Sequence, residues 1–295
     1  MLRVIHNPVA GPKAVRKIDR IRAVLARRDV PHEIVKTTKP GHAVHLAREA
    51  AVEGHTAVVA VGGDGTINEV ANGLAGSATR LCVVPHGTGN VFAAEVGLPR
   101  TVEGCVDLLF DGKTVDIPLA RAGERYFVLL ASAGFDAEVV ERMTQRGKNV
   151  LGIAAYFVAG LRHLARYQPT LWMEFPGRER IEAQAVLVCR GKRYGAWVTM
   201  VPDGNLAGDR LRVVALCSRG RVAIARFALS ALFGRAASSP AVLVRETQSV
   251  LVRSRIPSAA QVDGDYLGPL PVRFEMTPTM LRVVVPRDFL VRQSL

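Results

Sequence analysis

Apolar and polar positions follow two different patterns along the chain, and the first pattern covers residues 1–115. Residues 14–28 carry apolar side chains at helical spacing, whereas residues 56–62 and 80–85 are almost continuously apolar. Strands that are apolar on both faces and are separated by helices are typical of a parallel sheet covered by helices. The pattern therefore predicts a Rossmann-like α/β domain with flanking helices.

From residue 116 onward the apolar runs are short and are separated by turn residues. Segments such as 125–132 and 182–189 are strand-like, and their spacing predicts an antiparallel β-sandwich. Helical patterns near residues 137–167 and 221–233 interrupt the strands. We expect two domains: an α/β domain over 1–117, joined by the C-terminal tail 286–295, and a β-sandwich domain over 118–285.

The charge balance favours an anionic partner. The chain has 39 Lys and Arg against 26 Asp and Glu, a net charge of +13, which suits nucleotide phosphates, nucleic acid or an acidic membrane face. The alternative explanation of the positive net charge is a composition that is generally rich in arginine. The four cysteines are scattered without a CxxC pair, as in a reducing compartment. Because the sequence shows neither a leader pattern nor a run of about 18 apolar residues, we expect a cytoplasmic protein.

The stretch VVAVGGDGTINEVANGL ends an apolar strand on residues that stabilise neither strand nor helix. Gly62, Gly63 and Gly65 can expose backbone N–H groups to a phosphate, and a helix that begins near Thr66 adds its dipole. Asp64 would repel a bare phosphate, which suggests a Mg²⁺ ion between the carboxylate and a nucleotide. The alternative is a glycine-rich turn in which Asp64 caps the helix.

A second loop repeats this design. The stretch VVPHGTGNVFA places Gly87, Thr88 and Asn90 between an apolar strand and a helix. A third candidate loop carries Asn7 and Gly11 after the first strand. Because open parallel sheets bind ligands beyond the carboxyl ends of their strands, we expect the three loops to lie together at one sheet edge.

In order and spacing, these motifs resemble the diacylglycerol kinase catalytic-domain superfamily, which includes bacterial soluble lipid kinases, sphingosine kinases and ceramide kinases. The matching segments are Asn7-Pro8-x-Ala10-Gly11, Thr37 with Gly41-His42-Ala43, Gly62-Gly63-Asp64-Gly65-Thr66, Asn68-Glu69, Asn72-Gly73-Leu74, Pro85-x-Gly87-Thr88-Gly89-Asn90, Gly134-Phe135-Asp136 and Asp263-Gly264-Asp265. They extend over almost the whole chain. The GGDGT element also occurs in NAD kinases and phosphofructokinases, but NPxAG and PxGTGN narrow the resemblance.

The resemblance implies a kinase that binds ATP between its domains and phosphorylates a primary hydroxyl of a diacylglycerol-like, sphingoid or ceramide lipid. It implies nucleotide contacts from Asn7, Thr37, Gly62, Gly63, Gly65, Thr66, Glu69, Gly87, Thr88 and Asn90. It implies that Asp64 and Asp116 organise a catalytic Mg²⁺, directly or through water. It also implies a general base in the Asp263-Gly264-Asp265 turn, so Asp263 and Asp265 complete the candidate catalytic set.

Three positions depart from the family pattern. Val91 stands where many members have Asp, and Asp265 is one methylene shorter than the usual Glu. A misplacement of about 1 Å can cost about a hundredfold in rate, so Asp64 is the competing general base. A structural-metal segment that usually reads D-G-x-L-D is Asp209-Arg210-Leu211-Arg212 here, which weakens the expectation of a structural Mg²⁺ at Asp209. An NAD kinase-type phosphotransferase and an inactive nucleotide or lipid sensor remain the alternative functions.

Two helical segments bear on partners. Residues 219–239 form a basic, apolar stretch that suits either an anionic bilayer surface or a core helix with snorkelling arginines. Residues 148–167 suit an acyl-chain pocket by similar logic. Aromatic residues make up only 6% of the chain and no nucleic-acid-binding module is present. We therefore expect peripheral membrane association and no nucleic-acid partner, and the sequence leaves a homodimer open.

Overall fold

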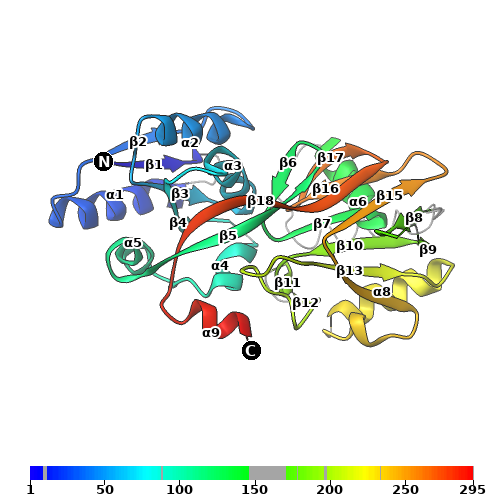
Figure 1. The fold of residues 1–295 in the computed structure, drawn as a ribbon. Helices are drawn as coiled ribbons and strands as arrows, with labels where there is room; N and C mark the ends of the chain where they lie inside the picture. The colour runs from blue at the N-terminus through cyan, green and yellow to red at the C-terminus, as the bar shows by residue number, and fades with distance from the viewer. Residues whose placement is uncertain are drawn as a thin grey trace. The chain divides into compact units, whose positions relative to one another are not determined.

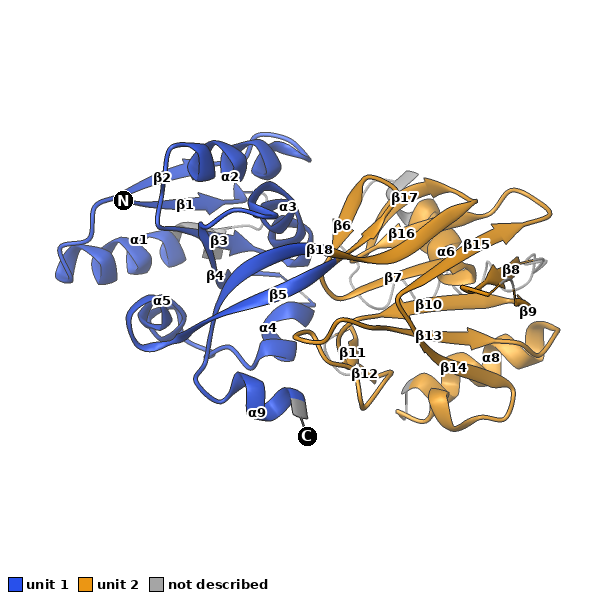
Figure 2. Ribbon diagram, in the orientation of Figure 1, with its two compact units in different colours: residues 1–119, 278–295 blue, residues 120–277 orange. Residues whose placement is uncertain are grey.

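The computed structural model describes residues 1–8, 12–87, 89–145, 171–177, 179–195, 198–232 and 234–294 (Figure 1). The chain divides into two compact units, which Figure 2 colours separately. Unit 1 comprises Met1–Leu119 and Pro278–Leu295, and unit 2 comprises Ala120–Thr277. The strands β5 (Lys113–Ala122) and β18 (Val272–Val285) contribute residues to both units.

Unit 1 is built on a parallel sheet with the strand order β2-β1-β3-β4-β18. The bounds are β2 (His32–Lys36), β1 (Leu2–His6), β3 (Ala57–Gly62) and β4 (Arg80–Pro85), and β18 adds its C-terminal part. Every residue of β3 is buried, because the strand is central and both of its faces are covered. The continuous apolar pattern thus correctly predicted a parallel sheet.

Helices cover both faces of this sheet (Figure 1). On one face, α1 (Pro12–Arg27) and α5 (Val102–Asp111) share an apolar core with the strands, in which Ile21 and Val106 are fully buried. On the other, α2 (His42–Val52) packs closely on α3 (Asp64–Leu74), because a Cβ at Gly73 would lie 2.4 Å from the carbonyl oxygen of Val44. The short helices α4 (Val91–Val96) and α9 (Phe289–Ser294) complete the described part of unit 1.

Unit 2 consists of two antiparallel sheets with a shared apolar core. One sheet has the order β14-β13-β10-β7-β16-β17, and in the other β15 lies between β8 and the N-terminal part of β18. Val186 and Val213 of the first sheet are buried in one core with Met173, Val250 and Phe274 of the second. This arrangement confirms the predicted C-terminal antiparallel β-sandwich.

The strands of unit 2 are short. Their bounds are β6 (Arg125–Phe127), β7 (Leu130–Gly134), β8 (Leu171–Glu174), β9 (Arg180–Ala183), β10 (Ala185–Cys189), β11 (Arg193–Tyr194), β12 (Val198–Thr199), β13 (Leu211–Leu216), β14 (Val242–Thr247), β15 (Ser249–Ser254), β16 (Ala259–Val262) and β17 (Asp265–Pro269). The helical elements are α6 (Phe135–Gln145), α8 (Arg221–Leu232) and the 3₁₀ turn η2 (Ala236–Ser238).

The C-terminal domain boundary differs from the expected one. Residues 278–285 fall within the expected β domain of 118–285, but they belong to unit 1, and Val283 pairs in parallel with Leu81 of β4. The reason is that β18 is one 14-residue strand that leaves the sandwich and continues into the parallel sheet. The second helical pattern, 137–167, is described only as far as Gln145, and the expected acyl-chain segment 148–167 lies outside the described residues.

Two features agree with the sequence. Among the described residues, every helix is too short or too polar to cross a lipid bilayer. The four cysteines are free, and Cys82, Cys105 and Cys189 are buried. Burial raises the pKa of the Cys105 thiol to about 11, so this thiol behaves as an apolar core group rather than as a nucleophile.

Candidate functional site

The loops that follow β1, β3 and β4 meet at the carboxyl edge of the parallel sheet. The backbone N–H of Asn7 donates to the carbonyl of Val61 at 3.1 Å, and the N–H of His86 donates to the carbonyl of Gly62 at 2.7 Å. The side-chain amide of Asn7 also reaches the hydroxyl of Thr66 at 3.3 Å. The three loops singled out in the sequence therefore converge as predicted. Val9–Gly11 and Thr88 lie outside the described residues.

The two glycine-rich loops touch each other through their backbones, and we call Gly62, Gly63, Gly87 and Gly89 the glycine cradle. A Cβ on Gly87 would lie 2.7 Å from the Cα of Gly63, which is closer than real Cβ contacts allow. A Cβ on Gly89 would lie 3.0 Å from Oδ2 of Asp64. Glycine is required at position 87 because the two backbones approach closely, and at position 89 the missing side chain leaves room beside the half-buried Asp64 carboxylate.

The Asp64 carboxylate links the two loops. Asp64 is the first residue of α3, yet its Oδ1 accepts a hydrogen bond at 3.1 Å from the backbone N–H of Phe92, in the first turn of α4. The alternative that Asp64 caps its own helix is therefore wrong: Gly63 is the N-cap of α3, and Asp64 accepts at the N-terminus of α4 instead. Oδ2 has no hydrogen-bond partner within the described part of the chain, and it faces the open side of Gly89.

Asn90 shapes the second loop from within. Its backbone is left-handed, with φ at 46°. Its side-chain Oδ1 accepts from the N–H of Gly87 at 2.9 Å, and its Nδ2 donates to the carbonyl of the same glycine at 2.7 Å. Asn tolerates the left-handed region better than most residues. Asn90 therefore fixes the loop geometry, and its side-chain polar atoms are both engaged with Gly87.

Glu69 and Thr37 support the site from the neighbouring layer. The two Glu69 carboxylate oxygens accept from the N–H groups of Gly41 at 2.9 Å and Ala43 at 3.1 Å, at the start of α2. Thr37 is buried, and its N–H donates to the carbonyl of His6 at 2.9 Å. In this structure Glu69 is committed to the N-terminus of α2, which stabilises a carboxylate. Its position favours holding the loop that carries Thr37 over direct nucleotide contact.

Two residues at the carboxyl edge of the parallel sheet were not identified from the sequence. The ammonium of Lys17, on α1, donates to the carbonyl of Pro85 at the start of the second loop, and burial lowers the pKa of that ammonium. His6 ends β1 beside Asn7, and its Nδ1 is buried without a partner among the described residues. Burial, followed by the nearby Lys36 charge, lowers the pKa of His6. Neither residue lies in a motif, so only the fold brings them here: His6 through the register of β1 and Lys17 through the packing of α1.

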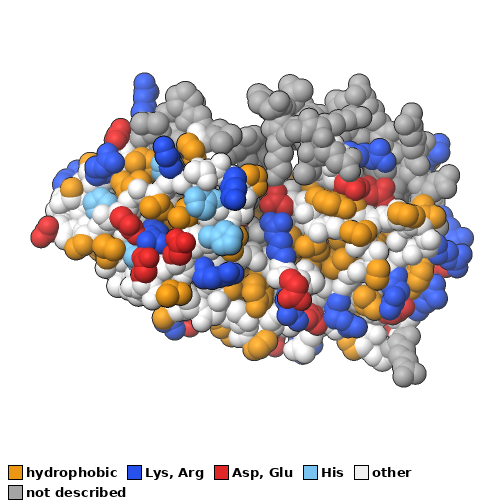
Figure 3. Space-filling model, turned by 90° about the horizontal axis from the view of Figure 1, so that it is seen from above, with side chains coloured by type: hydrophobic (Ala, Val, Ile, Leu, Met, Phe, Trp, Pro, Cys, Tyr) orange, Lys and Arg blue, Asp and Glu red, His pale blue; other side chains and the backbone are white. Residues whose placement is uncertain are grey.

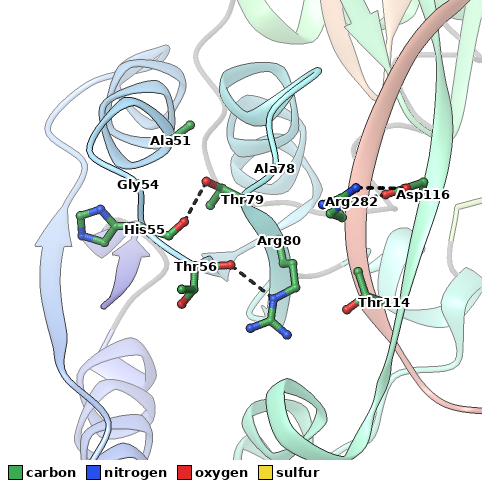
Figure 4. A pocket seen from close by; sticks show the side chains of 10 residues that line it. All are labelled: Ala51, Gly54, His55, Thr56, Ala78, Thr79, Arg80, Thr114, Asp116 and Arg282. Atoms are coloured by element: carbon green, nitrogen blue, oxygen red, sulfur yellow. Dashed lines mark hydrogen bonds and ion pairs between the residues drawn. The ribbon is translucent and has the colours of Figure 1, made fainter.

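The structure does not bring Asp116 to Asp64. Asp116 lies on β5 and forms an ion pair with Arg282 of β18, with Nε to Oδ1 at 2.9 Å. Both residues line a pocket of about 690 Å³ with residues that precede β3 and begin β4, namely His55, Thr56, Thr79 and Arg80 (Figure 4). The glycine loops follow the other ends of these strands. Since β4 runs from Arg80 to Pro85, five steps of about 3.3 Å separate the pocket end of this strand from the end that leads into the second glycine loop by roughly 16 Å.

In unit 2, the two aspartates of the late turn have different surroundings. The Asp263 carboxylate accepts from three successive backbone N–H groups, those of Val128, Leu129 and Leu130, at 2.8 to 2.9 Å. Asp265 forms an ion pair with Arg125, with Nη2 to Oδ2 at 2.8 Å. Asp263 is therefore a structural anchor of its turn, which contradicts the expectation of a reactive Asp263. Asp265, like Asp263, is partly exposed.

A buried polar network supports the turn that carries Asp263 and Asp265. The hydroxyl of Ser132 donates to Asp136, and the side-chain amide of Gln261 reaches Asp136 at 3.1 Å. The carbonyl oxygen of the same Gln261 side chain accepts from the N–H of Gly264 at 2.8 Å. Ser132, Asp136 and Gln261 are all buried. The Gly134-Phe135-Asp136 motif therefore acts through Gln261 to fix the turn that carries Asp265.

The residues around Asp209 do not fit a structural metal ion. The Asp209 side chain is 76% exposed, and its ion-pair partner is Arg210 at 3.8 Å. The adjacent carbonyls of Leu206 and Gly208 accept hydrogen bonds from the buried Arg190 guanidinium, at 2.7 Å for Gly208. Burial lowers the pKa of Arg190 to about 10, so its charge persists at neutral pH. A fixed cation thus occupies the carbonyl oxygens that a divalent ion would need.

A cluster of two glutamates and a histidine in unit 1 also has its charge balanced by an arginine. Glu33, Glu53 and His55 place ligand atoms within 4.8 Å of one another. The buried guanidinium of Arg3 lies among them, bonded to Glu33 and to Glu53 at 2.6 Å. On the surface seen in Figure 3, acidic, basic and histidine side chains likewise lie close together. The cluster is therefore explained as a charge network around Arg3.

Two family models match the chain and together cover most of it. The family described as "Diacylglycerol kinase catalytic domain" matches residues 1–122, and the family described as "YegS C-terminal NAD kinase beta sandwich-like domain" matches residues 130–285. The first range contains the glycine cradle and Asp64. The second contains the turn with Asp263 and Asp265.

Relatives match along nearly the whole length. The chain is 29% identical to the diacylglycerol kinase of Bacillus subtilis (strain 168) over 97% of this chain and 96% of that protein. It is 27% identical to the diacylglycerol kinase of Staphylococcus haemolyticus over 97% and 88%. The crystal structure of a diacylglycerol kinase from Bacillus anthracis str. Sterne superposes with a TM-score of 0.71 at 18% identity, over 96% of both chains. A second structure from that strain gives 0.77 at 19%, also over 96% of both chains, which shows a shared fold.

Proposed function

The chain belongs to the diacylglycerol kinase catalytic-domain family and is a lipid kinase, and we propose that it transfers the γ-phosphate of ATP to the primary hydroxyl of a diacylglycerol-like, sphingoid or ceramide lipid. One observation carries the proposal in unit 1. A Cβ on Gly89 of the glycine cradle would lie 3.0 Å from Oδ2 of Asp64, so this loop runs close beside that carboxylate, and Asp64 is itself the first residue of α3. Exposed amides, a helix dipole and an accessible carboxylate together suit a metal-bridged polyphosphate.

The kinase family implies ATP with a divalent metal, and the cradle fits that pair. The cradle is open beside Oδ2 of Asp64, at the place that a Cβ on Gly89 would fill. Asp64 would hold the metal there, which we take to be Mg²⁺, and a bound Mg²⁺ would neutralise charge on the transferred phosphoryl group. Asp116 is not assigned to this ion, because it lies with Arg282 at the other end of the sheet.

The chain's own residues then have distinct tasks. The first-turn N–H groups of α3 have no intrahelical acceptor and can donate to phosphate oxygens. Asn7 holds the hydroxyl of Thr66 in place, and Lys17 holds the carbonyl of Pro85. Such pre-organised donors stabilise developing charge without reorganising during the reaction.

We assign the general base to Asp265 and keep Asp64 as its competitor. Asp265 is held by Arg125 on one oxygen, while Asp263 and Gln261 fix the turn around it. The base would accept the proton of the lipid hydroxyl as the hydroxyl oxygen attacks the γ-phosphate. Arg125 orients the Asp265 carboxylate.

The proposal includes cytoplasmic localisation with peripheral association at an anionic membrane surface, where the lipid substrate resides. A net charge of +13 supports it. Nucleic-acid binding is not part of the proposal, and the homodimer stays open.

The decisive assay uses labelled ATP with diacylglycerol, sphingosine and ceramide in detergent micelles, and separately with NAD. Label in a lipid is the expected result. Label in NADP alone would replace the proposal by an NAD kinase, an alternative motivated by the NAD kinase-like sandwich family of residues 130–285. Transfer that is equally weak in the wild type and in Asp64→Ala would instead indicate an inactive nucleotide or lipid sensor.

A further inference from the structure

One helix of unit 2 has apolar side chains on both of its long faces. On the inward face of α8, Ile224 is buried and forms a small core with Leu216. Phe227 packs against this core. Outward, Val222 is 73% exposed and Leu229 is 57% exposed. Positions 222, 225 and 229 lie on one helical face, so these side chains form a continuous outward stripe with Ala225. The inward face explains how α8 is held, whereas the outward stripe belongs to none of the apolar cores of the described residues.

Arginines border this stripe without acidic neighbours in the same segment. Residues 219–239 contain Arg219, Arg221, Arg226 and Arg235 and no Asp or Glu. Each of these four arginines is exposed. An exposed apolar stripe flanked by arginines alone is the arrangement of a helix that lies in a membrane interface.

Charge from neighbouring strands extends the basic surface. Glu182 of β9 forms an ion pair with Arg219. Arg219, by its hydrogen bond, lowers the pKa of the Glu182 carboxyl, and the charges of Arg255 and Arg180 act in the same direction. One carboxylate is therefore shared among three arginines, and the surface keeps a net positive charge. The exposed Ile256 adjoins Arg255 in sequence and adds apolar area.

We propose that the outward face of α8, with Val222, Ala225 and Leu229 as its apolar stripe and Arg221 and Arg226 beside them, docks this enzyme onto an anionic lipid bilayer. The inference deepens the proposed function, because it rests on a lipid substrate. Charge complementarity selects the bilayer. Anionic headgroups can pair with Arg221 and Arg226 beside the stripe, while the exposed Val222 and Leu229 offer apolar side chains to the acyl boundary.

The test is co-sedimentation with vesicles of phosphatidylcholine alone and with vesicles that contain phosphatidylglycerol. Wild type should bind the anionic vesicles in a salt-sensitive manner. Val222→Ser/Leu229→Ser should weaken this binding at least tenfold, and each of Arg221→Gln and Arg226→Gln should weaken it about fivefold. These side chains are exposed, so melting temperatures should not change.

Matched controls come from unit 1. Val52→Ser removes an apolar side chain that is 83% exposed, and Arg27→Gln removes an exposed arginine. Neither control should alter vesicle binding. Phosphorylation of short-chain diacylglycerol, sphingosine and ceramide dissolved as monomers should be equal in wild type and all α8 variants, and label in none of the three with wild type would refute the kinase proposal without deciding the docking.

Three results would overturn the docking proposal. The first is equal binding of wild type to neutral and anionic vesicles. The second is unchanged vesicle binding by the double variant. The third is a change of the double variant from dimer to monomer in light scattering while its vesicle binding persists, which would make the stripe a contact between copies of this chain.

Discussion

Oδ1 of Asp64 accepts a hydrogen bond from the backbone N–H of Phe92 at 3.1 Å, across 28 residues of sequence. This bond fastens the loop after β3 to the helix after β4. It leaves Oδ2 facing the open side of the glycine cradle. The Asp64 carboxylate therefore has two separable roles. Its Oδ1 accepts the hydrogen bond that holds the two loops together, and its negative charge can hold a metal ion.

Replacing Asp64 should separate these two properties. Asp64→Asn keeps an oxygen for the Phe92 N–H and loses the charge, so we expect near-wild-type melting but phosphoryl transfer reduced by about a hundredfold or more. Asp64→Ala also removes the cap and should cost about 1 kcal/mol of stability in addition. Calorimetry and a micelle-based kinase assay measure both effects. An active Asp64→Asn would refute the role in metal binding.

The contact between the two glycine loops predicts that alanine substitutions at Gly87 and Gly63 destabilise the protein to different extents. Gly87→Ala places a Cβ 2.7 Å from the Cα of Gly63, and this overpacking should destabilise the protein by about 1–3 kcal/mol. Gly63→Ala is the matched control, because its Cβ would lie 3.4 Å from the Cα of Gly87, an ordinary contact, and its φ is −83°. Urea unfolding of both variants tests this. Equal losses of stability would show that the two loops do not touch as described.

The two aspartates of the late turn should affect different measurements. Asp263→Asn replaces an oxygen that accepts backbone N–H groups by an NH₂ group, so we expect a loss of about 1–3 kcal/mol in unfolding free energy. Asp265→Asn should leave stability unchanged within about 0.5 kcal/mol and should lower kcat. The assignment of Asp265 as base would be wrong if kcat stayed within a factor of two, which would direct attention to Asp64.

Arg190 should make the protein indifferent to divalent ions in unit 2. We expect the melting temperature of Asp64→Asn, which lacks the proposed catalytic ion, to be the same with excess EDTA as with millimolar Mg²⁺. Arg190→Met should cost about 1–3 kcal/mol for each buried carbonyl that loses its donor. A stabilisation by Mg²⁺ that disappears in Asp209→Asn would contradict this prediction, since it would reveal a structural metal site.

His6 predicts a pH dependence of stability. Its pKa is lowered in the folded protein by burial and by Lys36, so the unfolded chain binds a proton more readily. Its contribution is therefore fully present above the ordinary value of about 6.5 and is lost as the pH falls below it. Urea midpoints at pH 7, 6 and 5 should fall more steeply for wild type than for His6→Gln. Parallel slopes would show that His6 is solvated.

The sequence by itself determined the elements and the chemistry of the main loops. Apolar periodicity and glycine placement are local properties, so β1, β3 and β4 and the loops after them could be read directly. The shared edge followed from a general rule of parallel sheets. The β-sandwich could be expected from the spacing of the strands. The continuation of β18 from the sandwich into the parallel sheet could not.

The tertiary structure alone decided which side chains meet. Asp64 caps α4, Glu69 caps α2 and Asp116 pairs with Arg282, and each of these contacts joins segments far apart in sequence. Strand register and helix packing fix such contacts, and neither is encoded in a local motif. For the same reason Lys17 was invisible in the sequence: it is an ordinary helix lysine until the fold sets it against the carbonyl of Pro85.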